Sequence, residues 1–120
     1  MAARLSNYPV IRDSQGEQTD PTTSVVLADT GAISDALGGG GIYEVMVVAS
    51  ASAAAKISVQ VRNVANDANV GDVHTFYVPA TATIGLPFRF EIERNQRVRA
   101  LVATNLTGTA IVSIVAQRAA

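Results

Sequence analysis

The stretch GGGGIYEVMVVAS, residues 38–50, decides the fold expected for this chain, because four glycines open directly into nine residues rich in β-branched and aromatic side chains. Strand alternation places one apolar set on a single face: Tyr43, Val45, Val47 and Ala49. The opposite face, interrupted by Glu44, is also apolar and holds Ile42, Met46 and Val48. A sandwich buries one face of each sheet, so the second apolar face predicts another cover: a loop, an arm or a neighbouring subunit.

Six further runs have strand character and are separated by turn residues. With residues 42–50 they make seven expected strands, at 24–28, 56–62, 73–78, 88–93, 97–103 and 109–117. Residues 56–62 alternate without a fault and direct Ile57, Val59 and Val61 inward. No helical period of useful length occurs, so the sequence predicts an all-β fold: a single antiparallel β-sandwich of about seven strands. The spacing fits a jelly-roll and an immunoglobulin-like arrangement equally well.

Residues 1–22 are polar and turn-rich, with no sustained period, and predict an irregular N-terminal arm before a sandwich domain at 23–120. Two interpretations of the arm stay open: a frayed terminus, or a docking segment that orders on a neighbouring surface. Its apolar anchors would be Leu5, Tyr8, Val10 and Ile11. The glycines at 38–41 are expected to be a flexible hinge, since a phosphate-binding loop follows a strand and opens a helix.

Composition limits the possible functions. The chain of 120 residues has no cysteine, 16% charged and 48% hydrophobic residues, and a net charge of −1. It is one domain, and its low charge favours oligomerisation, because a monomer would expose much apolar surface. The last expected strand, like 42–50, is apolar on both faces. We therefore predict an oligomer interface from Ile42, Met46, Val48, Val112 and Ile114.

The candidates for chemistry are few. His74 is the only histidine and has no evident catalytic or metal-binding partner, so a structural role is expected. Asp67, Asn69 and Asp72 lie in a loop without the spacing of a calcium site, and turn formation explains them better. We expect no cofactor, no metal and no enzymatic activity.

Arg94, Arg97 and Arg99 form the only local basic group. Cross-strand pairs of Arg97 and Arg99 with Glu91 and Glu93 are favoured over an anion site. The net charge of −1 gives no reason to expect nucleic-acid binding, and this group is the one local exception to it.

The first nine residues lack the apolar run of a signal peptide, and no apolar run reaches 18 residues. From these features we expect neither export by that route nor a membrane span.

Residues 41–117 resemble a family of small structural proteins of tailed bacteriophages, often described as head decoration or virion-associated proteins. Six segments carry the resemblance: GIYEV (41–45), VQVRNVAN (59–66), NVGDV (69–73), YVPA (77–80), ERNQRV (93–98) and LTGTA (106–110). Residues 1–40 do not contribute to it. The motifs are strand and turn patterns, so no functional residue is transferred from the family.

The resemblance implies a virion component, made in the host cytoplasm, that packs as a homo-oligomer, with a trimer favoured. A capsid decoration (cement) protein bound to the major capsid protein on the head surface is the leading hypothesis. A tail, baseplate or head-fibre module is the alternative within the virion. A carbohydrate-binding adhesion module is the alternative of another class, disfavoured by the absence of Trp and the presence of only three Tyr.

Overall fold

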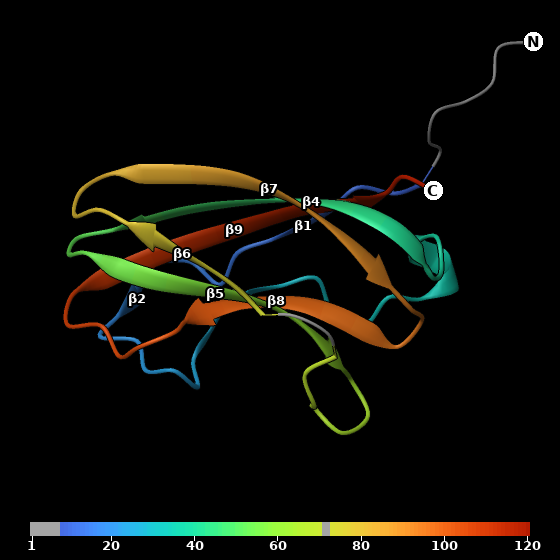
Figure 1. The fold of residues 1–120 in the computed structure, drawn as a ribbon, viewed down its shortest axis with the longest axis horizontal. Coiled ribbons are helices and arrows are strands. Elements are labelled where there is room, and N and C mark those ends of the chain that lie inside the picture. Colours follow the sequence, from blue (N-terminus) through green and yellow to red (C-terminus); the bar gives the residue numbers. More distant parts are fainter. Residues whose placement is uncertain (1–7, 71–72) are drawn as a thin grey trace, which may run out of the picture.

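The computed structural model describes residues 8–70 and 73–120, and these fold into two antiparallel sheets packed face to face (Figure 1). Sheet A has the order β1-β9-β4-β7, with β2 also paired to β9, and sheet B has the order β3-β8-β5-β6. The strands of sheet A are β1 (Ile11–Asp13), β2 (Gln18–Thr19), β4 (Gly41–Ala51), β7 (Thr83–Ile92) and β9 (Thr109–Arg118). The strands of sheet B are β3 (Val26–Asp29), β5 (Ala55–Asn63), β6 (His74–Val78) and β8 (Gln96–Val102). The all-β sandwich expected from the sequence is confirmed.

The order of the strands resolves the two topologies that the sequence left open. If β1 and β2 are counted as one interrupted strand, consecutive elements alternate between the sheets up to β5, and β6 to β9 then return beside them. This nesting of two Greek keys is the eight-stranded jelly-roll arrangement. It makes β4 the centre of sheet A, between β9 and β7, and gives it the longest ladders in the fold.

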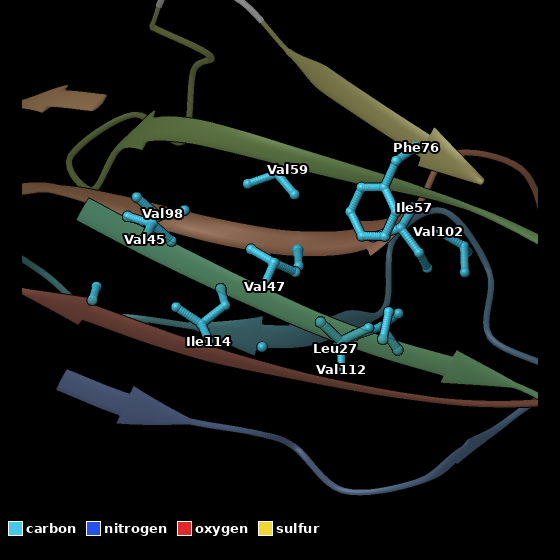
Figure 2. Close-up of a cluster of buried hydrophobic side chains, with 14 of the residues drawn as sticks. Leu27, Val45, Val47, Ile57, Val59, Phe76, Val98, Val102, Val112 and Ile114 are labelled. Atoms are coloured by element: carbon cyan, nitrogen blue, oxygen red, sulfur yellow. The ribbon is translucent and has the colours of Figure 1, made fainter. Parts of the chain in front are cut away.

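The core lies between the two sheets and is built almost entirely from aliphatic side chains. Figure 2 shows residues from both sheets pointing toward one another, among them Val45 and Val47 of β4 and Val59 of β5. The inward set predicted for residues 42–50 is confirmed, because Tyr43, Val45, Val47 and Ala49 are all buried. Ile57, Val59 and Val61 are also buried as predicted.

The N-terminal segment differs most from its prediction. Ile11–Asp13 and Gln18–Thr19 pair with β9, so the described part of residues 1–22 is the outer strand of sheet A and not an irregular arm. Ile11 is buried in the core, and the Leu27 carbonyl accepts a hydrogen bond from the Gln15 N–H at 3.0 Å. The strand escaped notice because its two paired pieces are three and two residues long, too short to show a period.

The run of four glycines, expected to be a flexible hinge, lies where distant segments of the chain pack closely together. Gly38 has a φ of 107°, and a Cβ there would lie 2.7 Å from the ring of Tyr8. A Cβ on Gly41 would collide with the Arg118 guanidinium. The Ile42 N–H donates to the Ala120 carbonyl at 2.8 Å, so the C-terminal residues close against the same corner. The glycines are needed because three distant segments meet here.

Strand β7 also begins earlier than predicted. The strand was expected at residues 88–93, yet β7 runs from Thr83 to Ile92 and contains Pro87 opposite Met46. Proline is tolerated in an edge strand, where its missing N–H need not break a ladder. Partnership with the long strand β4 therefore extends β7 beyond what local sequence signals indicate.

Candidate interaction surface

The outer face of sheet A carries exposed apolar side chains that the core does not use. Strand β4 presents Ile42, Met46 and Val48 there, opposite its buried set. The register places Val115 of β9 and Pro87 of β7 on either side of Met46. These three side chains form an apolar row across three adjacent strands.

A shallow groove of about 680 Å³ runs over this row. Its walls include Val10 near β1 and Arg12 on β1, and its floor includes Met46, Pro87 and Val115. Val10 and Met46 are 47% and 41% exposed, which is high for side chains of this kind. The volume falls within the range of ligand pockets, but the groove is open along its length and suits an extended surface contact.

Polar groups border the groove at one end. Arg89 of β7 lies opposite Glu44 of β4, with Nη2 and Oε1 separated by 3.2 Å. Gln117 of β9 occupies the position on the other side of Glu44. Both charged side chains of the pair are two-thirds exposed, so the pair contributes well under about 1 kcal/mol to folding. Its significance lies in giving a polar edge to an apolar floor.

At the other end of the face, Ile111 of β9 lies beside Ser50 of β4 and is 40% exposed. A second hollow of about 300 Å³ borders these two residues, with Thr83 of β7 and Glu17 among its walls. The apolar surface of sheet A therefore extends along the strands as well as across them.

Two of the predicted interface residues are in the wrong place. Val112 and Ile114 have no exposed surface, because they point into the core from β9. The outward residues of β9 are Ile111, Ser113 and Val115. The prediction overlooked a signal in the sequence, because Thr109, Ser113 and Gln117 share the outward face of β9 and mark it as the more polar one. Ile42, Met46 and Val48 do lie on the outer face.

The predicted docking anchors are divided among different roles. Leu5 lies outside the described residues. Ile11 is buried, and Tyr8 packs on Gly38 with the Arg118 guanidinium 4.8 Å from the centre of its ring. Val10 remains exposed on the groove. Tyr8 and Ile11 thus hold the segment onto its own sheet.

The outer face of sheet B is polar and contains an ionic cluster. Oδ1 of Asp67 lies 3.0 Å from Nε of Arg62, 2.9 Å from Nη2 of Arg97 and 3.3 Å from Nη2 of Arg99. Oδ2 of Asp29 lies 3.6 Å from Nη1 of Arg97 and 3.8 Å from Nε of Arg99. Hydrogen bonds from Arg62 and Arg97 lower the pKa of the Asp67 carboxyl to about 2. The predicted pairing of Arg97 and Arg99 with Glu91 and Glu93 is therefore wrong, since their partners are Asp29 and Asp67.

The remaining candidates for chemistry do not assemble a reactive site. His74 is exposed and its ring lies 5.4 Å from that of Phe90 and 5.5 Å from that of Phe88. Asp67 forms ion pairs with Arg62, Arg97 and Arg99, and Asp72 lies outside the described residues. In the part of the chain that the structure describes, no three His, Cys, Asp or Glu side chains come together as metal ligands. The same residues contain no helix of the length and apolarity needed to span a membrane.

Gly38, Gly41, Tyr8 and Arg118 meet at one corner of the sandwich, here called the glycine corner, and the buried phenol of Tyr43 also lies there. Tyr43 donates to the Gly39 carbonyl at 2.5 Å, and burial raises the pKa of its hydroxyl while the nearby Arg118 acts in the opposite direction. The N–H groups of Gly38 and Gly39 donate to the Asp35 and Ser34 carbonyls. Because these two N–H groups already donate to carbonyls of the same chain, they are not available to bind an anion. The corner therefore has a structural role.

Comparison with known proteins adds one similarity of fold. A scan against protein-family models and a search of curated proteins each give no match. Among solved structures, the chain is similar to the Clostridium thermocellum endo-1,4-β-D-xylanase 10B structure containing CBM22-1 and GH10 modules complexed with xylohexaose. The match has a TM-score of 0.59 and 14% identity, and it covers 95% of this chain and 25% of that one. Identity at this level shows a shared β-sandwich fold and nothing about the ligand.

Proposed function

We propose that this chain is a structural protein of a tailed-bacteriophage virion, and specifically a capsid decoration protein that binds the outer surface of the head as an oligomer. The observation that carries the proposal is the apolar row of Met46, Val115 and Pro87 on the outer face of sheet A. Face residues of a sheet that are apolar and exposed in the single chain favour contact with another protein surface. In this proposal the outer face of sheet A is the contact surface between the chains of the oligomer, and the oligomer binds the head through several chains at once.

Three further properties support the proposal. The jelly-roll is a fold that viral capsid proteins use, although lectin domains use it too. The low charged fraction suits a chain that buries much of its surface in an assembly. The strand and turn motifs within residues 41–117 resemble those of phage decoration proteins, which implies the major capsid protein as partner and favours a trimer.

A protein of this kind would stabilise the shell by mass action. A protein that binds only the mature lattice lowers the free energy of that lattice relative to an open or ruptured form. If several chains of one oligomer bind at once, contacts that are weak singly become strong together. A broad shallow apolar face is suited to contact between the chains of such an oligomer.

Decoration of heads tests the proposal directly. Purified heads that lack the protein are mixed with wild type, with Met46→Asp and with the matched control Tyr77→Asp, and bound protein is measured after sedimentation. Tyr77 is 70% exposed on β6 in the opposite sheet, so its substitution adds the same charge away from the proposed contact. We expect Met46→Asp to lower occupancy at least about tenfold, because a desolvated charge opposes burial. Equal occupancy of all three proteins would contradict the proposal.

Position within the virion is a separate question. Electron cryo-microscopy of intact particles would place the protein on the head or in a tail, baseplate or fibre. Density for the jelly-roll confined to the tail would replace the decoration hypothesis with the tail alternative, while leaving the outer face of sheet A as the contact surface.

Carbohydrate binding is the second candidate, and one observation favours it. The groove on sheet A has the size of a ligand site, and the similar solved structure, of CBM22-1 and GH10 modules, is a complex with xylohexaose. Sugar sites usually offer an exposed aromatic face, whereas the one described aromatic residue that lines the groove, Phe88, is partly buried and packs against the core. The exposed Tyr77 lies on sheet B with Lys56 Nζ 5.6 Å from its ring centre. Saturable binding of xylohexaose that Met46→Asp abolishes would favour this candidate over decoration.

A further inference from the structure

The arginine cluster on sheet B has more positive charge than the carboxylates around it. Three guanidinium groups, from Arg62 on β5 and from Arg97 and Arg99 on β8, converge on a single oxygen, Oδ1 of Asp67, at 2.9 to 3.3 Å. Asp29 is the second carboxylate within reach. Among the described residues the cluster therefore holds three cations and two anions.

The hydrogen-bonding capacity of the cluster is also incompletely used. The Nε atoms of Arg97 and Arg99 are buried and make no hydrogen bond to the residues that the structure describes. Buried donors without acceptors are costly, so a cluster of this kind gains free energy when an additional acceptor enters. Planar guanidinium groups bind carboxylate and phosphate oxygens with paired hydrogen bonds, which makes such an acceptor the natural ligand.

The carboxylate that contacts the three guanidinium groups belongs to a loop residue, Asp67, and not to a strand of the sheet. Asp67 lies between β5 and β6 in a loop whose residues 64–69 are all exposed (Figure 1), and half of its own side chain is accessible to solvent. Its φ of 52° is in the left-handed region, which costs a residue with a side chain some backbone strain. The carboxylate thus reaches the arginines from a strained position at the surface.

We propose that the cluster of Arg62, Arg97 and Arg99 is a binding site for an oxyanion group, a carboxylate or a phosphate, and that the Asp67 carboxylate is its displaceable internal occupant. Because Asp67 already places one carboxylate oxygen at the point where the three guanidiniums meet, it marks the position of a ligand oxygen. This site lies on the sheet opposite the proposed contact surface and does not depend on the proposed function.

Anion titration of four proteins tests the site. Isothermal titration with sodium phosphate and with sodium acetate, at an ionic strength fixed by sodium chloride, is applied to wild type, Asp67→Asn, Arg97→Gln and Arg94→Gln. Arg94 is the matched control, since its exposed side chain pairs with Asp35 at 3.7 Å and is not part of the cluster. Comparison of the two salts identifies which oxyanion class the site prefers.

We expect saturable binding to wild type, binding to Asp67→Asn that is at least about tenfold tighter because a competing charge has been removed, and loss of binding in Arg97→Gln. Arg94→Gln should bind as wild type does. Absence of saturable binding to wild type, no gain in Asp67→Asn, or equal losses in Arg94→Gln and Arg97→Gln would each overturn the proposal. Since Asp67→Asn is expected to gain affinity, a folding defect in Arg97→Gln would not obscure the result.

Discussion

The two outer faces of the sandwich differ in the side chains that they expose and in whether those side chains find partners within the chain. On sheet B, Arg62, Arg97 and Arg99 meet Asp29 and Asp67, so its charged groups find partners within the chain. On sheet A, apolar side chains lie in adjacent strands and remain exposed around a shallow groove. Charged groups that pair within the chain do not require a covering protein surface, although, among the described residues, the excess positive charge and the unpaired Nε donors of this cluster leave it able to bind a small anion. A face whose apolar groups stay in water gains free energy when another surface covers it.

The contrast depends on which residues of β9 point outward, and a pair of neighbouring substitutions tests that assignment. Ile114→Ala should lower the free energy of unfolding by about 2–5 kcal/mol, because it opens a cavity in the core. Val115→Ala, on the outer face, should cost less than about 1 kcal/mol. Urea unfolding of both variants measures the difference. Equal losses would show that β9 does not have the register described here.

This pair also shows where sequence reasoning succeeds and where it stops. The inward faces of β4 and β5 were predicted residue by residue because Glu44 on one strand and Lys56, Ser58, Gln60 and Arg62 on the other mark the polar side. Strand β9 also has such markers, since Thr109, Ser113 and Gln117 all lie on its outward face, but they were not used, and Val112 and Ile114 were assigned to the wrong face.

A substitution in the N-terminal strand should cause the next largest loss of stability. Ile11→Ala should cost about 2–4 kcal/mol, since Ile11 is buried against the core from β1. Val10→Ala is the matched control and should cost less than about 1 kcal/mol, because Val10 is nearly half exposed. Thermal unfolding of both variants provides the measurement. If Ile11→Ala melts with wild type, residues 8–22 are a detachable arm after all.

Such a strand could not be predicted locally, because its pairing is decided by a partner about a hundred positions away. Ile11 pairs with Ala116, and the register has no signal in the five paired residues of β1 and β2 themselves. The role of the glycines was hidden for the same reason. Their need for small size comes from Tyr8 and Arg118, which are remote in sequence.

A substitution in the glycine corner should cause a smaller loss of stability. Gly41→Ala should cost about 1–3 kcal/mol, because the added methyl group collides with Arg118 and the Ala120 carbonyl. Gly85→Ala is the matched control on β7, where the nearest atom to a Cβ is a methyl of Val48 at an ordinary 3.6 Å. It should be neutral or slightly stabilising. Chemical denaturation compares the two, and an equal loss in both would contradict the close packing described for the corner.

Acid should weaken the sheet B cluster in a defined window. The pKa of Asp67 is about 2 in the folded chain and 3.8 is its ordinary value, so the pairing stabilises the fold above about pH 4 and is lost as the pH falls toward 2. Melting temperatures of wild type and Asp67→Asn should therefore converge over that range. Because Asp67 is at the surface, the effect is the smallest of the four. Parallel curves from pH 6 to pH 2 would show that the pairing contributes nothing to stability.

Sedimentation velocity of wild type, Met46→Asp and Tyr77→Asp at micromolar concentration tests whether the outer face of sheet A is a contact surface between chains. We expect wild type and Tyr77→Asp to sediment as an oligomer of the 12.5 kDa chain, with a trimer favoured, and Met46→Asp to shift toward the monomer. A monodisperse wild-type monomer, or an oligomer that Met46→Asp leaves intact while Tyr77→Asp dissociates it, would contradict the assignment of that face.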